Sequence, residues 1–503
     1  MLMTTLQRIQ PEKGCFFPPF KVDFTRSIPI HRQLYDWYQA AVADGRLRPG
    51  QRVPSTRSLA AELGVSRAPV LAAFEQLLAE GYFEAIIGAG TRISDTIPEM
   101  PAAPVADRSR SRPAKAGARS GSKFAAGLTA GNGPWWNNEG IFRANLPALD
   151  HFPARTWASL LSRHASRTTN SMMAYGDVMG HLPLREAIAR YLGAARAVCC
   201  KASQIMIVSG SQHGLQITAR ALLDAGDQVW MEEPGYPGAH AAFAMAGARM
   251  APVPVDQAGM KIEHGVAHFP EARLAYVTPS HHYPLGTGMS AARRMQLLSW
   301  AARRGAWIVE DDYDSEYRFG AHPMPALQGL DTDERVIYLG TFSKVMFPGI
   351  RLGYIIIPED LIPSFRAVRE ATDIFAPPLA QAALADFIAE GHFSRHLRKM
   401  RTLYMRRRAA LAEAMHRRVG DSFRIIGIDA GMHLTGFLPE QADDVHIANR
   451  AGAMGVSAIP LSTCYLAESS PGLILGYGNA SETQIERGTA LLAGVIEAAG
   501  GSR

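Results

Sequence analysis

The stretch Thr341-Phe342-Ser343-Lys344, together with Arg351 a short way downstream, decides the fold of this 503-residue chain. An apolar run at 335–340 precedes it and predicts a buried strand, and a loop at 345–350 follows it. Taken alone, a lysine in a loop is usually a solvated side chain, because short motifs match by chance. The meaning of Lys344 therefore rests on the other segments of the chain.

Three upstream segments place polar and aromatic groups at the ends of expected strands. Residues 308–318 read Ile-Val-Glu-Asp-Asp-Tyr-Asp-Ser-Glu-Tyr-Arg, a strand that leads into acids and aromatic residues. Ser209-Gly210-Ser211-Gln212 lies at a strand-to-helix turn, and Pro234-Gly235-Tyr236-Pro237 follows the next strand. Together with Lys344, these segments contain the groups needed to bind pyridoxal phosphate.

Each of these groups can interact with a different part of that cofactor. A lysine supplies the amine for an imine, and burial or nearby positive charge lowers its pKa enough to make it nucleophilic. A carboxylate beside the ring nitrogen keeps that nitrogen protonated, so that the ring withdraws electrons. Tyrosines contact the phenolic oxygen and the ring face, while hydroxyls, an arginine fork and N–H groups at a helix start hold the phosphate.

The order and spacing of these motifs resemble fold-type I aminotransferases over residues 140–500. The resemblance implies that Lys344 forms the imine, that Asp311 pairs with the ring nitrogen and that Tyr313 contacts the phenolic oxygen. It implies further that Tyr236 stacks on the ring. The residues it assigns to the phosphate are Ser211, Gln212, Ser343 and Arg351.

The positive charge of the chain is concentrated at its N-terminal end. The net charge is +6, and residues 1–123 hold 17 Lys and Arg against 11 Asp and Glu, a difference of +6. The remaining 35 basic and 35 acidic residues cancel. This distribution predicts an N-terminal part that faces nucleic acid and a neutral body that handles a ligand.

Residues 29–95 show helical spacing, short turns and then a glycine-rich ribbon. Ser55 and Ser66 stand where helix N-caps are expected, and 81–93 reads as two short strands. Helix, turn, helix and ribbon make a winged helix-turn-helix. The resemblance to the GntR family of bacterial DNA-binding domains rests on four motifs: Leu47-Arg48-Pro49-Gly50, Pro54-Ser55-Thr56-Arg57, Leu63-Gly64-Val65-Ser66-Arg67 and Gly88-Ala89-Gly90-Thr91. It implies that Arg57, Ser66 and Arg67 face DNA and that Gly88 and Gly90 form a wing tip in the minor groove.

The rest of the chain predicts a multidomain protein. Strands and helices alternate from about residue 205, which favours a mainly parallel α/β sheet with helices on both faces. We expect an arm at 1–26, the winged helix-turn-helix at 27–95, a basic flexible linker at 96–129 and the aminotransferase-like domain at 130–503. Its small lobe, with long helices and a β segment at 432–438, follows residue 360.

Several further residues of the large domain have expected roles. The segment with Tyr175 resembles the aminotransferase motif whose tyrosine reaches the cofactor phosphate of the neighbouring subunit, which implies a homodimer. His281 or His282 could contact cofactor or effector, and we select His282 as the cofactor residue. The strand with Ile474 matches the one on which many aminotransferases carry an arginine that clamps the substrate carboxylate. Isoleucine there weakens the interpretation as an ordinary amino-acid transaminase.

Composition narrows the class of protein further. The four cysteines, Cys15, Cys199, Cys200 and Cys464, show neither Cys-x-x-Cys spacing nor a metal-ligand pattern. No apolar stretch reaches the ~18 residues of a membrane span, and the N-terminus lacks a signal-peptide pattern. We therefore expect a cytoplasmic protein with no metal site.

A GntR-type winged helix joined through a long linker to an aminotransferase-like domain resembles the MocR subfamily of transcriptional regulators. The resemblance implies a pyridoxal phosphate-dependent regulator that binds double-stranded DNA as a domain-swapped homodimer. An amine or amino-acid effector, or pyridoxal phosphate itself, would be sensed through the Lys344 imine. Two alternatives remain open: an active aminotransferase with a tethering DNA-binding domain, and a structural DNA-binding protein whose aminotransferase fold is inert.

Overall fold

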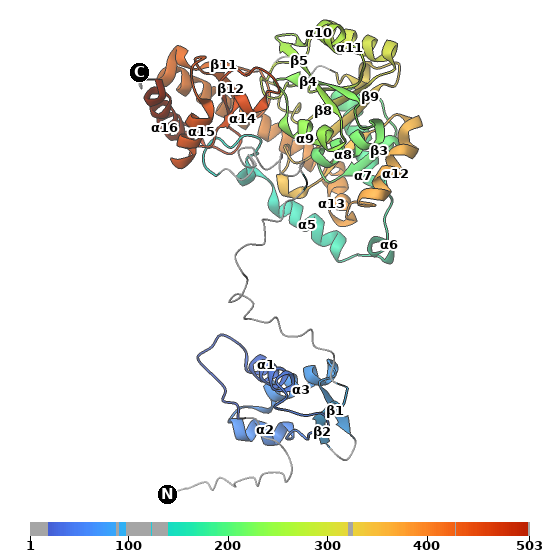
Figure 1. Cartoon of the computed structure of the whole chain (residues 1–503), viewed down its shortest axis with the longest axis vertical. Helices are drawn as coiled ribbons and strands as arrows, with labels where there is room; N and C mark the ends of the chain where they lie inside the picture. Colours follow the sequence, from blue (N-terminus) through green and yellow to red (C-terminus); the bar gives the residue numbers. More distant parts are fainter. Residues whose placement is uncertain are drawn as a thin grey trace. The chain divides into compact units, whose positions relative to one another are not determined.

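The computed structural model describes residues 19–86, 90–96, 122, 139–319, 325–427 and 429–500. It divides the chain into two units, Met1–Gly121 and Ser122–Arg503 (Figure 1). The expected wing residue Gly88 and most of the expected linker at 96–129 lie outside the described residues. No described helix has both the length and the apolar character that crossing a membrane requires.

The N-terminal unit is a winged helix-turn-helix. Ser55 caps its second helix by accepting a bond from the Ser58 backbone N–H at 3.1 Å, and Gly64 ends that helix at a φ of 65°. Ser66 stands at the N-cap of the third helix, although its side chain makes no capping bond. The elements are α1 Ile30–Ala43, α2 Thr56–Leu63, α3 Arg67–Ala79 and an antiparallel pair, β1 Phe83–Ile86 and β2 Gly90–Ile93.

Aromatic rings make the core of this unit. Tyr38 of α1, Phe74 of α3 and Phe83 of β1 are all buried. Their ring centroids lie 5.1–5.8 Å apart in edge-to-face contact, a favourable arrangement for aromatic pairs. The unit thus has its own hydrophobic core, which joins α1, α3 and β1 and also includes Leu59 and Ala60 of α2.

The large unit is built on an eight-stranded sheet. Most neighbouring strands run parallel, as the sequence predicted, but β10 is antiparallel to both β3 and β9, and β6 is antiparallel to β5. Strands buried on both faces read as continuous apolar runs, which is why the sequence showed them well. The order across the sheet is β3 Ile205–Val208, β10 Gly353–Ile356, β9 Val336–Thr341, β8 Trp307–Asp312, β7 Ala272–Val277, β4 Gln228–Glu233, β5 Arg249–Asp256 and β6 Gly259–Met260.

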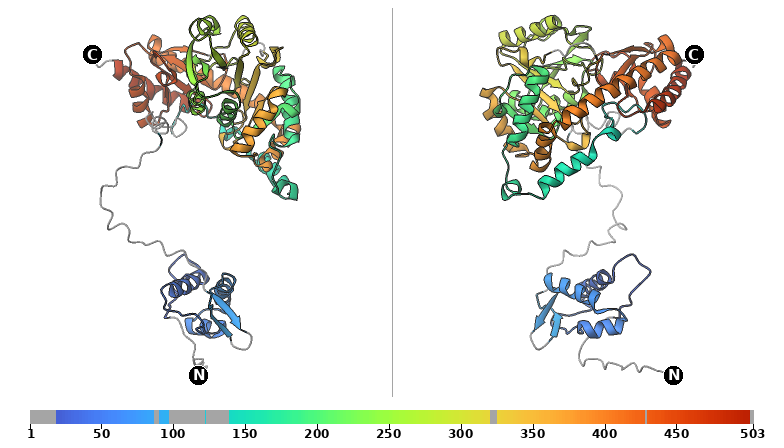
Figure 2. Two further views of the ribbon diagram at one scale, coloured as in Figure 1. Left: turned by 45° about the vertical axis from the view of Figure 1, so that its right-hand side comes forward. Right: turned by 180° about the vertical axis from the view of Figure 1, so that it is seen from behind.

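Helices cover both faces of this sheet (Figure 2). Successive residues of β4 show the two faces: Val229 and Met231 pack in one hydrophobic cluster, whereas Trp230 packs in another and stacks on Trp300 at 3.9 Å. The helices of this lobe are α5 Ala154–Ala165, α6 Asn170–Met173, α7 Leu182–Arg196, α8 Ser211–Leu222, α9 Pro237–Met245, α10 Ile262–His268, α11 Ala291–Arg304, α12 Ile362–Thr372 and α13 Pro378–Ala389.

The small lobe contains more sheet than the sequence predicted. The expected segment at 432–438 is β12, and the expected strand with Ile474 is β14. The two further strands, β11 and β13, have only three and two residues, too few to give a recognisable alternation. The strands, in sheet order, are β11 Arg424–Ile426, β12 His433–Phe437, β14 Gly472–Gly476 and β13 Ile459–Pro460; the helices are α14 His392–Val419, α15 Asp444–Ala453 and α16 Glu482–Gly500.

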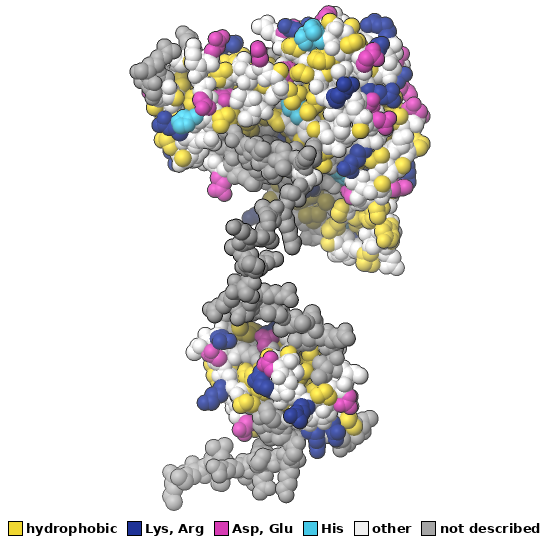
Figure 3. All heavy atoms as spheres, viewed as in Figure 1, with side chains coloured by type: hydrophobic (Ala, Val, Ile, Leu, Met, Phe, Trp, Pro, Cys, Tyr) yellow, Lys and Arg dark blue, Asp and Glu magenta, His cyan; other side chains and the backbone are white. Residues whose placement is uncertain are grey.

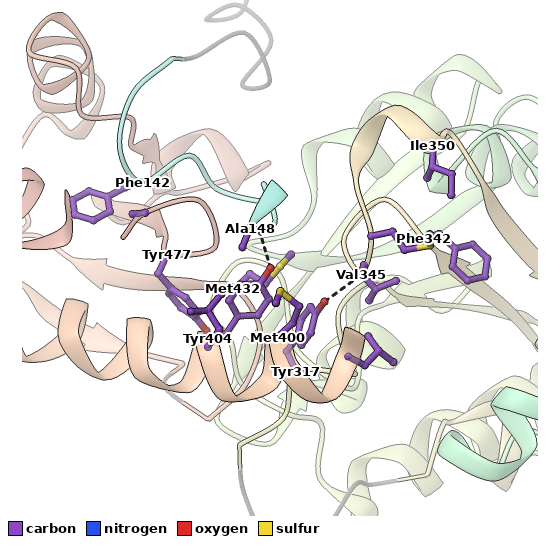
Figure 4. Close-up of a cluster of buried hydrophobic side chains, with 14 of the residues drawn as sticks. Phe142, Ala148, Tyr317, Phe342, Val345, Ile350, Met400, Tyr404, Met432 and Tyr477 are labelled. Carbon is purple, nitrogen blue, oxygen red and sulfur yellow. Dashed lines mark hydrogen bonds between the residues drawn. The ribbon is translucent and has the colours of Figure 1, made fainter. Parts of the chain in front are cut away.

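A continuous hydrophobic cluster joins the small lobe to the loop after β9 (Figure 4). The ring of Tyr404 on α14 contacts the rings of both Tyr317 and Tyr477, and the backbone N–H of Ala148 donates to the Tyr404 hydroxyl at 2.9 Å. The Tyr317 hydroxyl donates to the carbonyl of Val345 at 3.5 Å. The residue directly after Lys344 is therefore anchored in a core that both lobes share.

Candidate cofactor and DNA-binding sites

The predicted cofactor residues gather at the carboxyl ends of parallel strands, where α/β sheets bind ligands. Lys344 follows β9, Asp311 is the penultimate residue of β8, and Tyr313 comes directly after that strand. Ser211 begins α8 immediately beyond β3. The fold thus brings to one edge three segments that are separate in sequence.

Lys344 has the properties of a reactive amine. Its side chain is partly buried, and the Nζ atom donates to the carbonyl of Asn145 at 3.4 Å. Burial lowers the pKa of Lys344 to about 8; the charges of Asp314 and Asp311 oppose this shift, and that of Arg351 adds to it. A neutral, nucleophilic amine is therefore more abundant at neutral pH than in an exposed lysine.

Asp311 presents one free oxygen at the site. Its Oδ2 atom accepts a bond from the Tyr276 hydroxyl at 2.8 Å, whereas Oδ1 is buried without a partner among the described residues. Burial raises the pKa of Asp311 to about 6, although the bond from Tyr276 opposes that shift. A buried, unpaired carboxylate oxygen is costly, and a protonated ring nitrogen would satisfy it.

The structure gives His281 and His282, the two histidines considered as cofactor contacts, different hydrogen-bond partners. The Tyr313 hydroxyl lies 2.9 Å from Nδ1 of His281, which also lies 2.9 Å from Oδ1 of Asp314. His282 instead accepts a bond from the backbone N–H of Leu285 at 3.3 Å. His281 is thus in contact with a predicted cofactor residue, and the cofactor role of His282 stays a prediction.

Arg351 and the start of α8 form the region expected to hold phosphate. Arg351 donates to the carbonyl of Ser209 at 2.6 Å. Gly210 precedes the helix with a φ of +95°, and a Cβ there would lie 3.4 Å from the Arg351 guanidinium. Glycine therefore permits the close approach of the guanidinium to the helix N-terminus, a favourable place for an anion.

The other two predicted phosphate residues differ in their contacts. The Ser343 hydroxyl is buried with no hydrogen-bond partner among the described residues, so it is available to a ligand. Gln212 donates to the carbonyl of Gly238 at 2.8 Å. That bond ties the first turn of α8 to α9, and a phosphate contact from Gln212 remains a prediction.

The two predicted tyrosines occupy different environments. Tyr236 is half-buried, and its ring meets that of Tyr283 edge-on at 5.5 Å, beside the site. Tyr175 lies between α6 and α7, is 84% exposed and has a ring contact with Phe375. Its exposed position suits a residue that would act on a neighbouring subunit rather than on its own chain.

Three residues near the site were given no role by the sequence. Asn145 holds the Lys344 amine from 199 positions away in sequence, with a φ of 65° that asparagine tolerates well. Tyr276 was hidden in the apolar strand β7, although a buried tyrosine hydroxyl usually needs a partner. Asp314 stood in the acidic cluster after β8 without a distinguishing pattern.

The predicted DNA-facing residues lie together at the surface of the N-terminal unit. Arg57 of α2 and Ser66 and Arg67 at the start of α3 are exposed, and Arg67 donates to the hydroxyl of Thr56 at 3.1 Å. Gly90 begins β2. Figure 3 shows exposed Lys and Arg side chains on this unit. Ser66 and Arg67 thus stand at the start of α3, the helix that enters the major groove in a helix-turn-helix, and their contact with DNA stays a prediction.

Comparison with known proteins decides the family. Residues 31–93 match the model of the bacterial regulatory proteins of the gntR family, and residues 142–470 match aminotransferase class I and II. The chain is 42% identical over 470 residues to the "Probable rhizopine catabolism regulatory protein MocR" of Rhizobium meliloti, covering 93% of this chain and 94% of the relative. This chain belongs to the MocR-type transcriptional regulators.

Other relatives fit the MocR-type architecture. The pyridoxine biosynthesis transcriptional regulator PdxR of Corynebacterium glutamicum is 30% identical over 91% of this chain and 93% of its own length. The kynurenine aminotransferase of Pyrococcus horikoshii, solved in complex with PMP, matches with a TM-score of 0.68 and 27% identity, covering 78% of this chain and 98% of the enzyme. The MocR-type chain is thus a helix-turn-helix regulator with a fold-type I aminotransferase-like unit.

Gly431 offers a test of how tightly this MocR-type site is packed. It adopts a φ of +82°, and a Cβ would lie 2.6 Å from Nδ1 of His281 and 2.8 Å from Oδ2 of Asp314. We expect Gly431→Ala to lower the free energy of unfolding of the large unit by about 2–4 kcal/mol, from strain and overpacking. Gly305→Ala, at a φ of +64° with open space around it, should cost only about 1–2 kcal/mol. Equal losses in denaturant titrations would contradict the packing described.

Proposed function

We propose that this regulator binds pyridoxal phosphate at Lys344 and changes its contacts with operator DNA when a small amine or amino-acid effector, or the cofactor itself, occupies the site. The observation that carries the proposal is the presence at one site of the Lys344 amine, whose pKa is lowered to about 8, and of the buried, unpartnered Oδ1 of Asp311. One group fits an aldehyde and the other fits a protonated ring nitrogen.

The donor set suits this cofactor at several points. Asp311 would hold the ring nitrogen, with Tyr276 orienting its carboxylate, and Tyr313 would hold the phenolic oxygen. Tyr236 would cover the ring face. When bound, the cofactor supplies an aldehyde carbon that a primary amine can take over from Lys344. The groups that would hold the phosphate are Ser211, Gln212, Ser343 and Arg351, with Tyr175 of a second copy and His282 as further predicted contacts.

Sensing requires two arrangements of the protein that the ligand binds with different affinity. When an effector amine replaces Lys344, the lysine amine would become free inside the protein. Lys344 lies in the same loop as Val345, and Val345 packs in the core that both lobes share, so this change would be felt by both lobes. We further propose a homodimer, supported by the exposed Tyr175, in which each DNA-binding unit rests on the other subunit through the linker at 96–129.

The proposal is tested by adding pyridoxal phosphate to the purified protein and recording visible absorption, followed by DNA affinity on a fragment obtained by binding selection. A visible band, and a DNA affinity that changes when an amine shifts the band, are the expected results. Absence of a band would refute cofactor binding. A band with a DNA affinity that neither pyridoxal phosphate nor any amine changes would refute sensing.

The lowered pKa of Lys344 gives a pH-dependent prediction. Only the neutral amine attacks an aldehyde, so the rate at which the visible band appears should rise about tenfold per pH unit below pH 8 and level off above it. An exposed lysine would keep rising towards 10.5. Asp314→Asn should move the plateau to lower pH, because the charge of Asp314 most opposes the shift. Stopped-flow absorption between pH 7 and 10 measures this, and a continuous rise to pH 10 would contradict it.

Transamination is a second candidate function, favoured by the likeness to aminotransferases and by the position of Lys344, Asp311 and Tyr313 at the ends of β9 and β8. Against it, Ile474 lies fully buried on β14 where an arginine clamp is expected. Turnover of a keto-acid acceptor at ordinary enzymatic rates would establish this function and refute pure sensing.

A further inference from the structure

Three polar side chains beside Tyr313 form a buried group that the proposed function does not use. His281 follows β7, Asp314 follows β8, and His433 lies on β12 of the small lobe. Each is at most 2% exposed, and one nitrogen or oxygen atom from each lies within 4.8 Å of the others. We call these three residues the acceptor cluster.

Hydrogen bonding indicates which ring nitrogens of His281 and His433 carry a proton. Nε2 of His433 lies 3.1 Å from the carbonyl of Pro284, which only accepts, so Nε2 carries the proton and Nδ1 keeps its lone pair. Burial lowers the pKa of His433 to about 3, which keeps the ring neutral. Nδ1 of His281 carries a proton towards Oδ1 of Asp314, because a carboxylate only accepts.

Three atoms of the cluster have no partner in the described part of the chain. Nε2 of His281, Nδ1 of His433 and Oδ2 of Asp314 are each buried without a hydrogen bond. Nδ1 of His433 and the carboxylate oxygen of Asp314 are acceptors. Buried polar atoms left unpaired cost stability, so the cluster is complementary to a ligand group that donates hydrogen bonds.

The acceptor cluster adjoins the proposed effector position. His281 contacts the Tyr313 hydroxyl, the His433 ring lies 5.6 Å from that of Tyr283, and the charge of Lys344 acts on His433. Tyr283 and Tyr313 pack with Ile474 in one apolar cluster. A ligand between these elements therefore meets acceptors on one side and, at the position of the missing clamp, an isoleucine.

We infer that the effector is a primary amine that carries a further hydroxyl or ammonium donor and no carboxylate, and that the acceptor cluster receives that donor. The inference rests on the proposed function and names its ligand class. A carboxylate would be repelled by Asp314 and would find no cation at Ile474, whereas a donor group satisfies the unpaired acceptors of His433 and Asp314.

The test uses full-length protein loaded with pyridoxal phosphate and three amines of equal chain length: butylamine, 4-amino-1-butanol and 4-aminobutanoate, with 1,4-diaminobutane as the ammonium form. The readout is the concentration that half-shifts the visible band. We expect the alcohol or the diamine to act at about tenfold lower concentration than butylamine, the gain of one buried hydrogen bond, and the acid to be weakest.

Variants connect this preference to the cluster. His433→Leu should abolish the donor preference while leaving the response to butylamine, and His433→Asn, which keeps an acceptor near Nδ1, should retain it. His446→Leu, at an exposed histidine of α15, should behave as the unaltered protein. Retention of the preference in His433→Leu would overturn the assignment.

Other outcomes are equally decisive. A band shifted equally by all amines, or at the lowest concentration by 4-aminobutanoate, refutes the effector class and leaves cofactor binding intact. Absence of any band refutes the proposed function itself. Recovery of one Zn²⁺ per chain that His433→Leu removes would also overturn the inference, because the acceptor atoms would then be metal ligands.

Discussion

Replacement of Lys344 by alanine is expected to abolish the visible absorption that the protein gains with pyridoxal phosphate. The covalent bond to the cofactor depends on this amine, and no other lysine stands among the site residues at the ends of β8 and β9. Non-covalent binding through Asp311 and Arg351 would survive in part. We expect the apparent affinity for the cofactor to fall by at least about a hundredfold, measured by equilibrium dialysis and by absorption after dialysis.

Controls separate this effect from misfolding. Lys201→Ala removes an exposed lysine that pairs with Glu359 at 2.6 Å and should leave the spectrum unchanged. The Lys344→Ala protein should bind DNA like the cofactor-free parent and lose its response to amines. A variant that keeps both its visible band and its amine response would place the reactive amine elsewhere.

Arg67→Ala should lower the affinity for operator DNA by about tenfold or more, because one phosphate or base contact contributes about 1–3 kcal/mol. Arg67 is exposed in the first turn of α3, with its Nε held by the hydroxyl of Thr56. A contact to phosphate would also reduce the slope of log affinity against log salt by about one. Fluorescence anisotropy at several salt concentrations measures both.

Two variants serve as references for Arg67. Arg46→Ala removes an exposed arginine that pairs with Asp44 at 3.0 Å, and it should change DNA affinity little. Thr56→Val removes the bond that orients Arg67 and should give a smaller loss than Arg67→Ala. Equal affinities for Arg67→Ala and the parent at every salt concentration would show that α3 does not present this residue to DNA.

Much of the fold followed from patterns that a single sequence carries. Buried strands such as β8 and β9 are apolar runs bounded by turn residues, and Ser55 and Gly64 mark the ends of α2 as capping chemistry requires. Strand direction was a different matter: apolar periodicity is the same for parallel and antiparallel strands, so the reversal of β10 could not be predicted. The strands β11 and β13 were too short to show a pattern.

In the candidate site, too, some residues could be predicted from sequence motifs and others could not. Lys344, Asp311 and Tyr313 could be predicted because each stands in a short motif at a strand end. Asn145 and His433 come from segments whose sequences carry no such motif, and only the folded chain brings them near Lys344. The choice between His281 and His282 depended on which ring faces Tyr313, a property of loop geometry that adjacent residues in sequence cannot reveal.

The hydrophobic cluster that follows Lys344 has a mechanical consequence. Close-packed interiors are nearly incompressible and transmit displacement, and Val345 is joined through Tyr317 to Tyr404 on the 28-residue helix α14. A shift of the Lys344 loop therefore cannot be absorbed where it occurs. We expect it to move α14 as a rigid rod, so that a change of a few tenths of an ångström at the amine becomes a rotation of the whole small lobe.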